Sequence, residues 1–136
     1  MRIDIPADSK LTYIPRSFAK GAGIKSFTIP SNVKEIDSRA FMSSALTSIE
    51  IPEGVTCIGL EAFVFCQNLE KVTLPSTLKK IKRSAFKDCP NLTEVIVPEG
   101  MGKVNWGLIG DTTFKGTHLN LKSQAALKAL GYTGSF

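Results

Sequence analysis

The stretch LEKVTLPSTLKKIKRSAFKDCPN, Leu69 to Asn91, is the clearest copy of a unit that recurs along the chain. The stretch before it, LTSIEIPEGVTCIGLEAFVFCQN from Leu46 to Asn68, matches it column by column. The matched columns pair Leu46 with Leu69, Ile49 with Val72, Ile51 with Leu74, Pro52 with Pro75, Val55 with Leu78, Ile58 with Ile81, Phe63 with Phe86 and Cys66 with Cys89. Self-similarity at this period is typical of a solenoid, because one unit buries too little apolar surface to fold alone. The sequence therefore predicts stacked turns.

The repeat accounts for almost the whole chain. The 136 residues, 43% hydrophobic and 21% charged, suit a single domain, 1–136. We expect about six turns of roughly 23 residues, with repeats at 1–23, 24–45, 46–68, 69–91 and 92–118 and a last strand and capping helix in 119–136. In the fifth copy, Val104 and Ile109 are expected in the columns of Ile81 and Phe86. A sixth strand is expected where Leu119 and Leu121 alternate with polar residues.

Within each turn, the spacing predicts short strands. In LxxIxIP the last two apolar residues alternate with a polar one, as in a strand with one buried face. A proline then ends the strand, because it can donate no ladder hydrogen bond. We expect these parallel strands to form one continuous sheet, with further short extended pieces at 34–36, 56–58 and 79–81. One-turn helical segments such as Ser84 to Lys87 should follow and turn Phe86 inward.

The full pattern, LxxIxIPxxVxxI followed by AFxxC, resembles the BspA-type, or treponemal-type, leucine-rich repeats. The sequence departs from the pattern at Ser44, which replaces the repeat cysteine, at Gly21 in the first turn, and in the fifth copy, which lacks AFxxC. The resemblance implies a curved leucine-rich repeat solenoid, α/β with mainly parallel β-structure. It also implies protein recognition, often adhesion at bacterial surfaces, and no catalytic activity.

The sequence predicts a cap at the C-terminal end of the solenoid and none at the N-terminal end. Ser123 is expected to N-cap a helix over Ala125–Leu130 that Gly131 ends, with Leu127 covering the last turn. At the other end the first strand, around Ile3, has nothing before it to cover its edge. We therefore expect this edge to be either the cut end of a longer chain or a contact between copies that gives a homo-oligomer, and Met1, as a natural start, favours the contact.

The three cysteines divide into two kinds. Cys66 and Cys89 share an inward column, so their Cα separation should permit a disulfide, but their side chains point the same way. We expect free thiols that act as small hydrophobic core residues. Cys57 aligns with Glu35, Lys80 and Lys103, which predicts an exposed thiol.

The sequence contains no constellation that indicates catalysis. His118 is the only histidine, and three dispersed cysteines do not make a zinc site, so we expect no metal and no cofactor. There is no phosphate-binding glycine loop of the GxxxxGK type. We therefore expect a protein that is not an enzyme.

Net charge and hydropathy limit which classes of partner and which cellular compartments fit the sequence. The net charge of +5 permits a polyanionic partner, but the basic run over 79–87 has no interleaved aromatics and no long helix, so we expect a solvated face and no nucleic acid. No apolar run reaches the roughly 18 residues that would span a bilayer. The opening MRIDIPADSK has acids and Pro6 where a signal peptide has an apolar segment. As written the chain reads as cytoplasmic, or as surface or secreted if a leader was removed.

Column alignment locates a candidate binding face on the main sheet, expected to be concave. Its outward positions carry short polar and charged side chains with one apolar member: Thr28, Ser48, Glu50, Lys71, Thr73, Glu94 and Ile96. These positions are either ordinary soluble surface or a contact surface, and solenoids commonly use this face for ligands.

A second candidate is an apolar patch on the opposite side. Apolar residues stand in columns that are polar in other turns: Met42, Leu60, Val64, Phe65 and Trp106. Trp106 is expected in the column of Leu60. A contiguous exposed apolar group indicates a contact surface, unless a loop folds over it.

The sequence thus predicts a protein-binding leucine-rich repeat module, with adhesion to host or matrix proteins as the form that the resemblance suggests. Two alternatives remain open: a structural module that assembles with its own copies through the N-terminal edge or the apolar patch, and a site for an apolar small molecule on the concave face.

Overall fold

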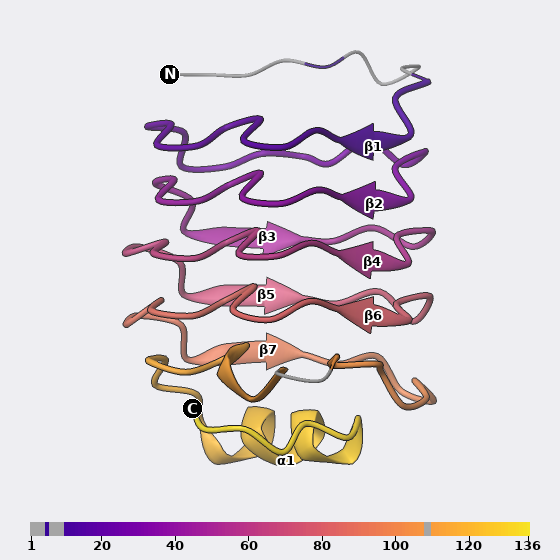
Figure 1. Ribbon diagram of the computed structural model, residues 1–136, viewed down its shortest axis with the longest axis vertical. Coiled ribbons are helices and arrows are strands. Elements are labelled where there is room, and N and C mark those ends of the chain that lie inside the picture. The colour runs from indigo at the N-terminus through magenta and orange to yellow at the C-terminus, as the bar shows by residue number, and fades with distance from the viewer. Residues whose placement is uncertain (1–4, 6–9, 108–109) are drawn as a thin grey trace.

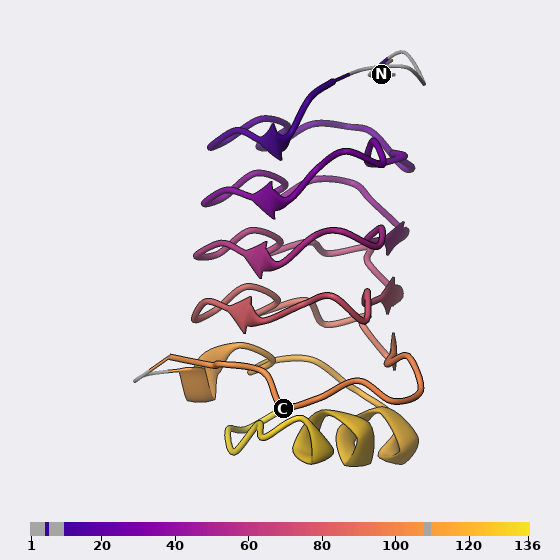
Figure 2. The ribbon, with the colours of Figure 1, turned by 90° about the vertical axis from the view of Figure 1, so that its right-hand side faces the viewer.

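A computed structural model describes residues 5, 10–107 and 110–136. Two sheets of short parallel strands face each other across the core (Figures 1 and 2). The first sheet has the order β1 (Tyr13–Ile14), β2 (Glu35–Ile36), β4 (Cys57–Ile58) and β6 (Lys80–Ile81). The second has the order β3 (Ser48–Glu50), β5 (Lys71–Thr73) and β7 (Glu94–Ile96). A 3₁₀ helix, η1 (Gly110–Thr112), and a helix, α1 (Leu121–Ala129), complete the elements.

The strands stack in parallel and in register as expected, but how they are divided between the two sheets differs from the prediction. The three-stranded sheet lies where a continuous main sheet was expected, and Ser48, Lys71 and Glu94 pair across it. The segment around Thr28 is not a strand. The shorter extended pieces form the larger sheet, which has four strands among the described residues. The expected six turns are therefore only partly expressed as strands, and the expected N-terminal strand around Ile3 lies outside the described residues.

The core is built from columns that run through the stack. Phe41, Phe63, Phe86 and Phe114 stack nearly parallel, with ring centroids 5.1, 5.0 and 5.3 Å apart. Each is fully buried. Aromatic stacking in this offset range adds to the free energy gained by burying the rings. One apolar ring per turn thus holds successive turns at a common spacing.

The fifth turn departs from the expected alignment. Phe114, and not Ile109, continues the phenylalanine column; Ile109 itself lies outside the described residues. Lys80 bridges to Asn105, so the next residue, Trp106, follows Ile81 in the isoleucine column where Val104 was expected. Both Val104 and Trp106 are buried. The reason is an insertion: 28 residues separate Phe86 from Phe114, against 23 between Phe63 and Phe86.

The expected one-turn helices before Phe41, Phe63 and Phe86 are β-turns, whereas the 3₁₀ helix η1 precedes Phe114. In the first four turns a non-glycine residue takes a left-handed backbone conformation at this position, as Arg39 (φ 55°), Glu61 (φ 53°) and Ser84 (φ 58°) do. Hydrogen bonds of the i to i+3 kind, such as Val64 N–H to Glu61 O at 3.2 Å, close these turns. A left-handed residue costs about 1–2 kcal/mol, and the stacked backbone hydrogen bonds around it offset that cost. A helix would not bring the chain back into register with the next turn.

Cys66 and Cys89 are free thiols buried in the core, as predicted. Their thiols donate to Phe41 O and Phe63 O, each at 3.1 Å, on the preceding turn. The side-chain hydrogen bond that the Cys89 thiol shares with Cys66, together with burial, raises the pKa of Cys89. Both cysteines therefore join adjacent turns as hydrogen-bonded core residues.

Helix α1 closes the end of the solenoid as predicted, but it starts earlier. Asn120 is the N-cap, and its side chain accepts from Ser123 N–H at 2.8 Å; Ser123 is not the cap. The expected sixth strand is absent, because Leu121 already belongs to the helix and is 82% exposed. Leu127 and Leu130 are buried against the last turn. Gly131, at φ 97°, follows the helix as expected.

Candidate functional site

Chemistry-bearing residues do not gather among the described residues. Within 5, 10–107 and 110–136, no group of three or more His, Cys, Asp or Glu side chains could hold a metal ion. The single histidine, His118, has its Nδ1 2.6 Å from Pro90 O at the surface. Cys57 is half-buried, not fully exposed, and pairs with Lys80. Lys80 in turn bridges to Asn105, so Asn105 and not Lys103 continues this column. Burial, together with the charge of Glu35, raises the pKa of the Cys57 thiol.

The three-stranded sheet brings most of the predicted face together. Its register aligns Ser48, Lys71 and Glu94 in one outward column, and Glu50, Thr73 and Ile96 in the next. Thr28 is exposed but lies outside the ladder. We name the face by its outward residues, the β3–β5–β7 face: Ser48, Glu50, Lys71, Thr73, Glu94 and Ile96.

Charge and shape vary along the β3–β5–β7 face. Lys71 Nζ lies 3.9 Å from Glu94 Oε1, an exposed pair with little energetic weight. Ile96 is 38% exposed beside them. Beside it lies a hollow of about 130 Å³ that is lined by residues of β7 and α1, among them Ile96, Lys122 and Ala126. An exposed apolar side chain next to a hollow, surrounded by polar groups, resembles the centre of a small contact surface.

The predicted apolar patch does not form one exposed surface. Val64 and Trp106 are 1% and 8% exposed, Met42 and Leu60 are half-buried, and only Phe65 is exposed, at 40%. The prediction placed Trp106 in the column of Leu60, but the insertion in the fifth turn moves it into the inward isoleucine column. Of the residues that remain accessible, Phe65 borders one groove and Leu60 borders another.

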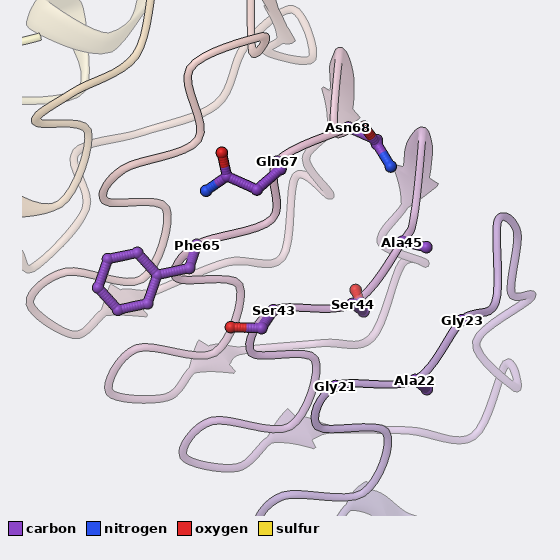
Figure 3. Close-up of a pocket in the computed structure, with 9 residues that line it drawn as sticks. All are labelled: Gly21, Ala22, Gly23, Ser43, Ser44, Ala45, Phe65, Gln67 and Asn68. Carbon is purple, nitrogen blue, oxygen red and sulfur yellow. The ribbon is translucent and has the colours of Figure 1, made fainter.

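Phe65 borders the first groove, which lies along one corner of the solenoid (Figure 3). This groove has a volume of about 400 Å³ and is lined only by uncharged residues: Gly21, Ala22, Gly23, Ser43, Ser44, Ala45, Phe65, Gln67 and Asn68. The second copy is one residue shorter than the third at this corner, and its residues there are small. The missing residue and the small side chains at this corner leave space for the groove. Both features can be recognised in the sequence. Phe65 holds a left-handed φ of 58°, unusual for a bulky residue.

The parallel strands, the repeated apolar columns and the capping helix define the class of leucine-rich repeat solenoids. The chain belongs to the BspA-type leucine-rich repeat family, which matches residues 2–122 in six copies.

The chain is similar to several solved structures, of which the two from Bacteroides support the fold assignment. A leucine-rich repeat protein from Bacteroides ovatus is similar at a TM-score of 0.56 and 23% identity, over 86% of this chain and 35% of that one. Another from Bacteroides capillosus gives 0.50 and 26%, over 84% and 79%. A leucine-rich repeat protein of T. pallidum gives 0.44 and 25%, over 79% and 60%. The chain thus spans 35% of the length of the B. ovatus protein.

No curated protein matches this sequence significantly. Among the described residues, no helix has the length and apolar character needed to cross a membrane.

Proposed function

We propose that the chain is a protein-binding module that receives its partner on the β3–β5–β7 face, in a role such as adhesion to host or matrix proteins. The observation that carries the proposal is the exposure of Ile96 beside the hollow at α1, within an otherwise polar face. Interfaces of this kind combine an apolar anchor with a polar rim. The family is a repeat family of the kind that offers extended surfaces for proteins.

The test is binding to a panel of immobilised purified matrix proteins, followed by surface plasmon resonance. A double variant, Ile96→Asp with Glu50→Lys, removes the anchor and reverses a charge on the face. We expect a loss of about 1–3 kcal/mol of binding free energy, because a central interface residue commonly carries that much.

A matched control makes the same changes in charge on the opposite sheet. Tyr13 is 50% exposed and pairs with the exposed Glu35, so Tyr13→Asp with Glu35→Lys alters charge and hydropathy in the same directions. We expect this control to bind as the parent chain does. Equal binding by the parent and the Ile96 variant would place the contact elsewhere, and no binding to any member of the panel would argue against adhesion.

Self-assembly is the alternative, and it is separated by oligomeric state. Sedimentation equilibrium over a range of concentrations distinguishes a monomer from a reversible dimer. A dimer that dissociates in the Ile96→Asp, Glu50→Lys variant would assign the β3–β5–β7 face to contact between copies.

A further inference from the structure

The second groove is lined by residues of β6 and of the turns that follow the strands of the four-stranded sheet, and by no residue of the β3–β5–β7 face. It has a volume of about 350 Å³. Its walls combine three cationic side chains with two apolar ones: Lys80, Lys82, Arg83, Leu60 and Trp106. We name it the basic groove.

The basic groove exists because the fifth turn leaves the sheet early. After β6 the ladder continues only as the single bridge between Lys80 and Asn105. Gly107 then adopts φ 75°, and its N–H donates to Asn105 Oδ1 at 2.8 Å. A positive φ of this size is readily adopted by glycine. Among the described residues, the bridge to Asn105 is the only strand pairing that β6 makes on this side.

The charge in the basic groove is not balanced by its own lining. No acidic residue lines it, and the ion pairs resolved among the described residues, Arg39–Glu61 and Lys71–Glu94, lie elsewhere. Glu61, in the neighbouring column, is held by Arg39 at 2.9 Å. Glu35 pairs with Cys57 on the neighbouring strand, and neither Glu35 nor Asp37 lines the groove. Three like charges around a concave surface attract an anion.

The apolar walls limit which anion fits. Leu60 stands where the neighbouring turns have Ser38 and Arg83, so its side chain is an apolar exception in that column. The Trp106 indole N–H donates to Leu130 O at 3.1 Å, which holds the ring in one orientation. A rigid apolar wall beside cations suits a ligand that carries an apolar side chain next to carboxylates, more than a simple anion.

We propose that the basic groove binds an acidic peptide segment of a partner protein. Carboxylates of the segment pair with Lys80, Lys82 and Arg83, and an aromatic or aliphatic side chain between them packs on Leu60 and Trp106. This site is separate from the β3–β5–β7 face, so either proposal can fail without the other. It also assigns a chemical class to a partner where the family assigns none.

The test uses a synthetic peptide with one phenylalanine flanked on both sides by glutamates and no tryptophan. Trp106 is the only tryptophan of the chain, so its fluorescence reports binding at the groove directly. We expect saturable quenching or a spectral shift with the parent chain. Lys82→Glu with Arg83→Glu should weaken binding by about tenfold or more, because charge pairs lost at a binding site are costly.

Two further variants separate the groove from net charge. Lys20→Glu with Lys25→Glu makes the same change in charge at exposed residues outside the groove and should leave the affinity within about twofold, since exposed charges at a distance are screened. Leu60→Ser keeps every charge and introduces the residue of the neighbouring turn, so it should fold and lower the affinity by about threefold to tenfold. Circular dichroism and thermal melts establish that each variant is folded.

Three outcomes would overturn the proposal. The first is equal loss in the Lys20, Lys25 and the Lys82, Arg83 variants, which would mean that net charge alone governs binding. The second is unchanged affinity when the peptide phenylalanine is replaced by serine, which would mean a simple anion site. The third is tighter binding of double-stranded DNA or a sulfated glycan than of the peptide, which would make the groove a polyanion surface.

Discussion

At the scale of single residues, several non-glycine residues adopt a left-handed backbone conformation that their residue type does not predict. The column of Gly21, Ser43, Phe65, Asp88 and Gly116 is left-handed throughout. Glycine adopts this conformation at no steric cost, and the others bear a cost that stacking must offset. Phe65 is the bulkiest of them and is also exposed, a combination that stability alone does not favour. Its position beside the uncharged groove of Figure 3 is the feature that sets it apart.

Gly59 gives a residue-scale prediction. A Cβ at this position would lie 2.7 Å from the backbone carbon of Asp37 and 2.8 Å from Ile36 O. Because these are backbone atoms of the preceding turn, Gly59→Ala should force the turns apart and lower the free energy of unfolding by about 1–3 kcal/mol. Chemical denaturation measures the loss.

Gly102→Ala is the control for Gly59, because a Cβ there meets nothing within 4 Å. It should change stability by less than about 1 kcal/mol. A Gly59→Ala variant as stable as the parent chain would mean that the two turns can separate without cost.

At the scale of elements, α1 is attached to the sheet edge by one hydroxyl group. Ser123 Oγ accepts from Val95 N–H at 3.0 Å and donates to Val95 O at 3.3 Å. It thereby pairs both backbone groups that the terminal strand β7 would otherwise leave without a neighbouring strand. Exposed strand edges invite pairing with other chains, so this contact also closes the sheet.

Ser123→Ala tests that contact. Both backbone groups of Val95 would lose their buried partner, and unsatisfied buried groups cost about 1–3 kcal/mol each. The variant should unfold at lower denaturant concentration. Lys122→Ala, in the same turn of α1 but exposed, should be close to neutral. Equal midpoints for the two variants would show that water replaces the hydroxyl without loss.

At the scale of the whole molecule, the turns form a stack in which each contacts mainly its neighbours (Figure 1). Stability in such a stack is a sum of local terms, and an uncovered end frays first. The solenoid is therefore sensitive to its C-terminal cover, α1, whose Leu127 side chain is fully buried.

Leu127→Asp should unseat this cover. Burying a charge in place of a leucine destabilises the helix contact by about 3–5 kcal/mol, so amide exchange should accelerate most in β7, less in β5 and least in β2. Hydrogen exchange followed by mass spectrometry resolves this gradient. Uniform acceleration through all turns would mean that the solenoid unfolds as one unit, and an unchanged melting temperature would rule out the cap.

The sequence by itself determined the repeat, the inward columns of the third and fourth turns, the free core cysteines and the presence of a C-terminal helix. These follow from local periodicity, because a residue that recurs at the same position in each turn meets the same neighbours. The polar residues of the β3–β5–β7 face were predicted for the same reason.

Only the tertiary structure decided the features at which periodicity breaks. The insertion before Phe114 changes the register of the fifth turn, which turns Trp106 inward and opens the basic groove beside it. Asn120 caps α1 because the chain pairs with Thr93 up to that residue and then meets β7 through Ser123. The register of the fifth turn and the start of α1 depend on which segments, distant in sequence, pack against each other. An alignment of repeat columns does not include these contacts.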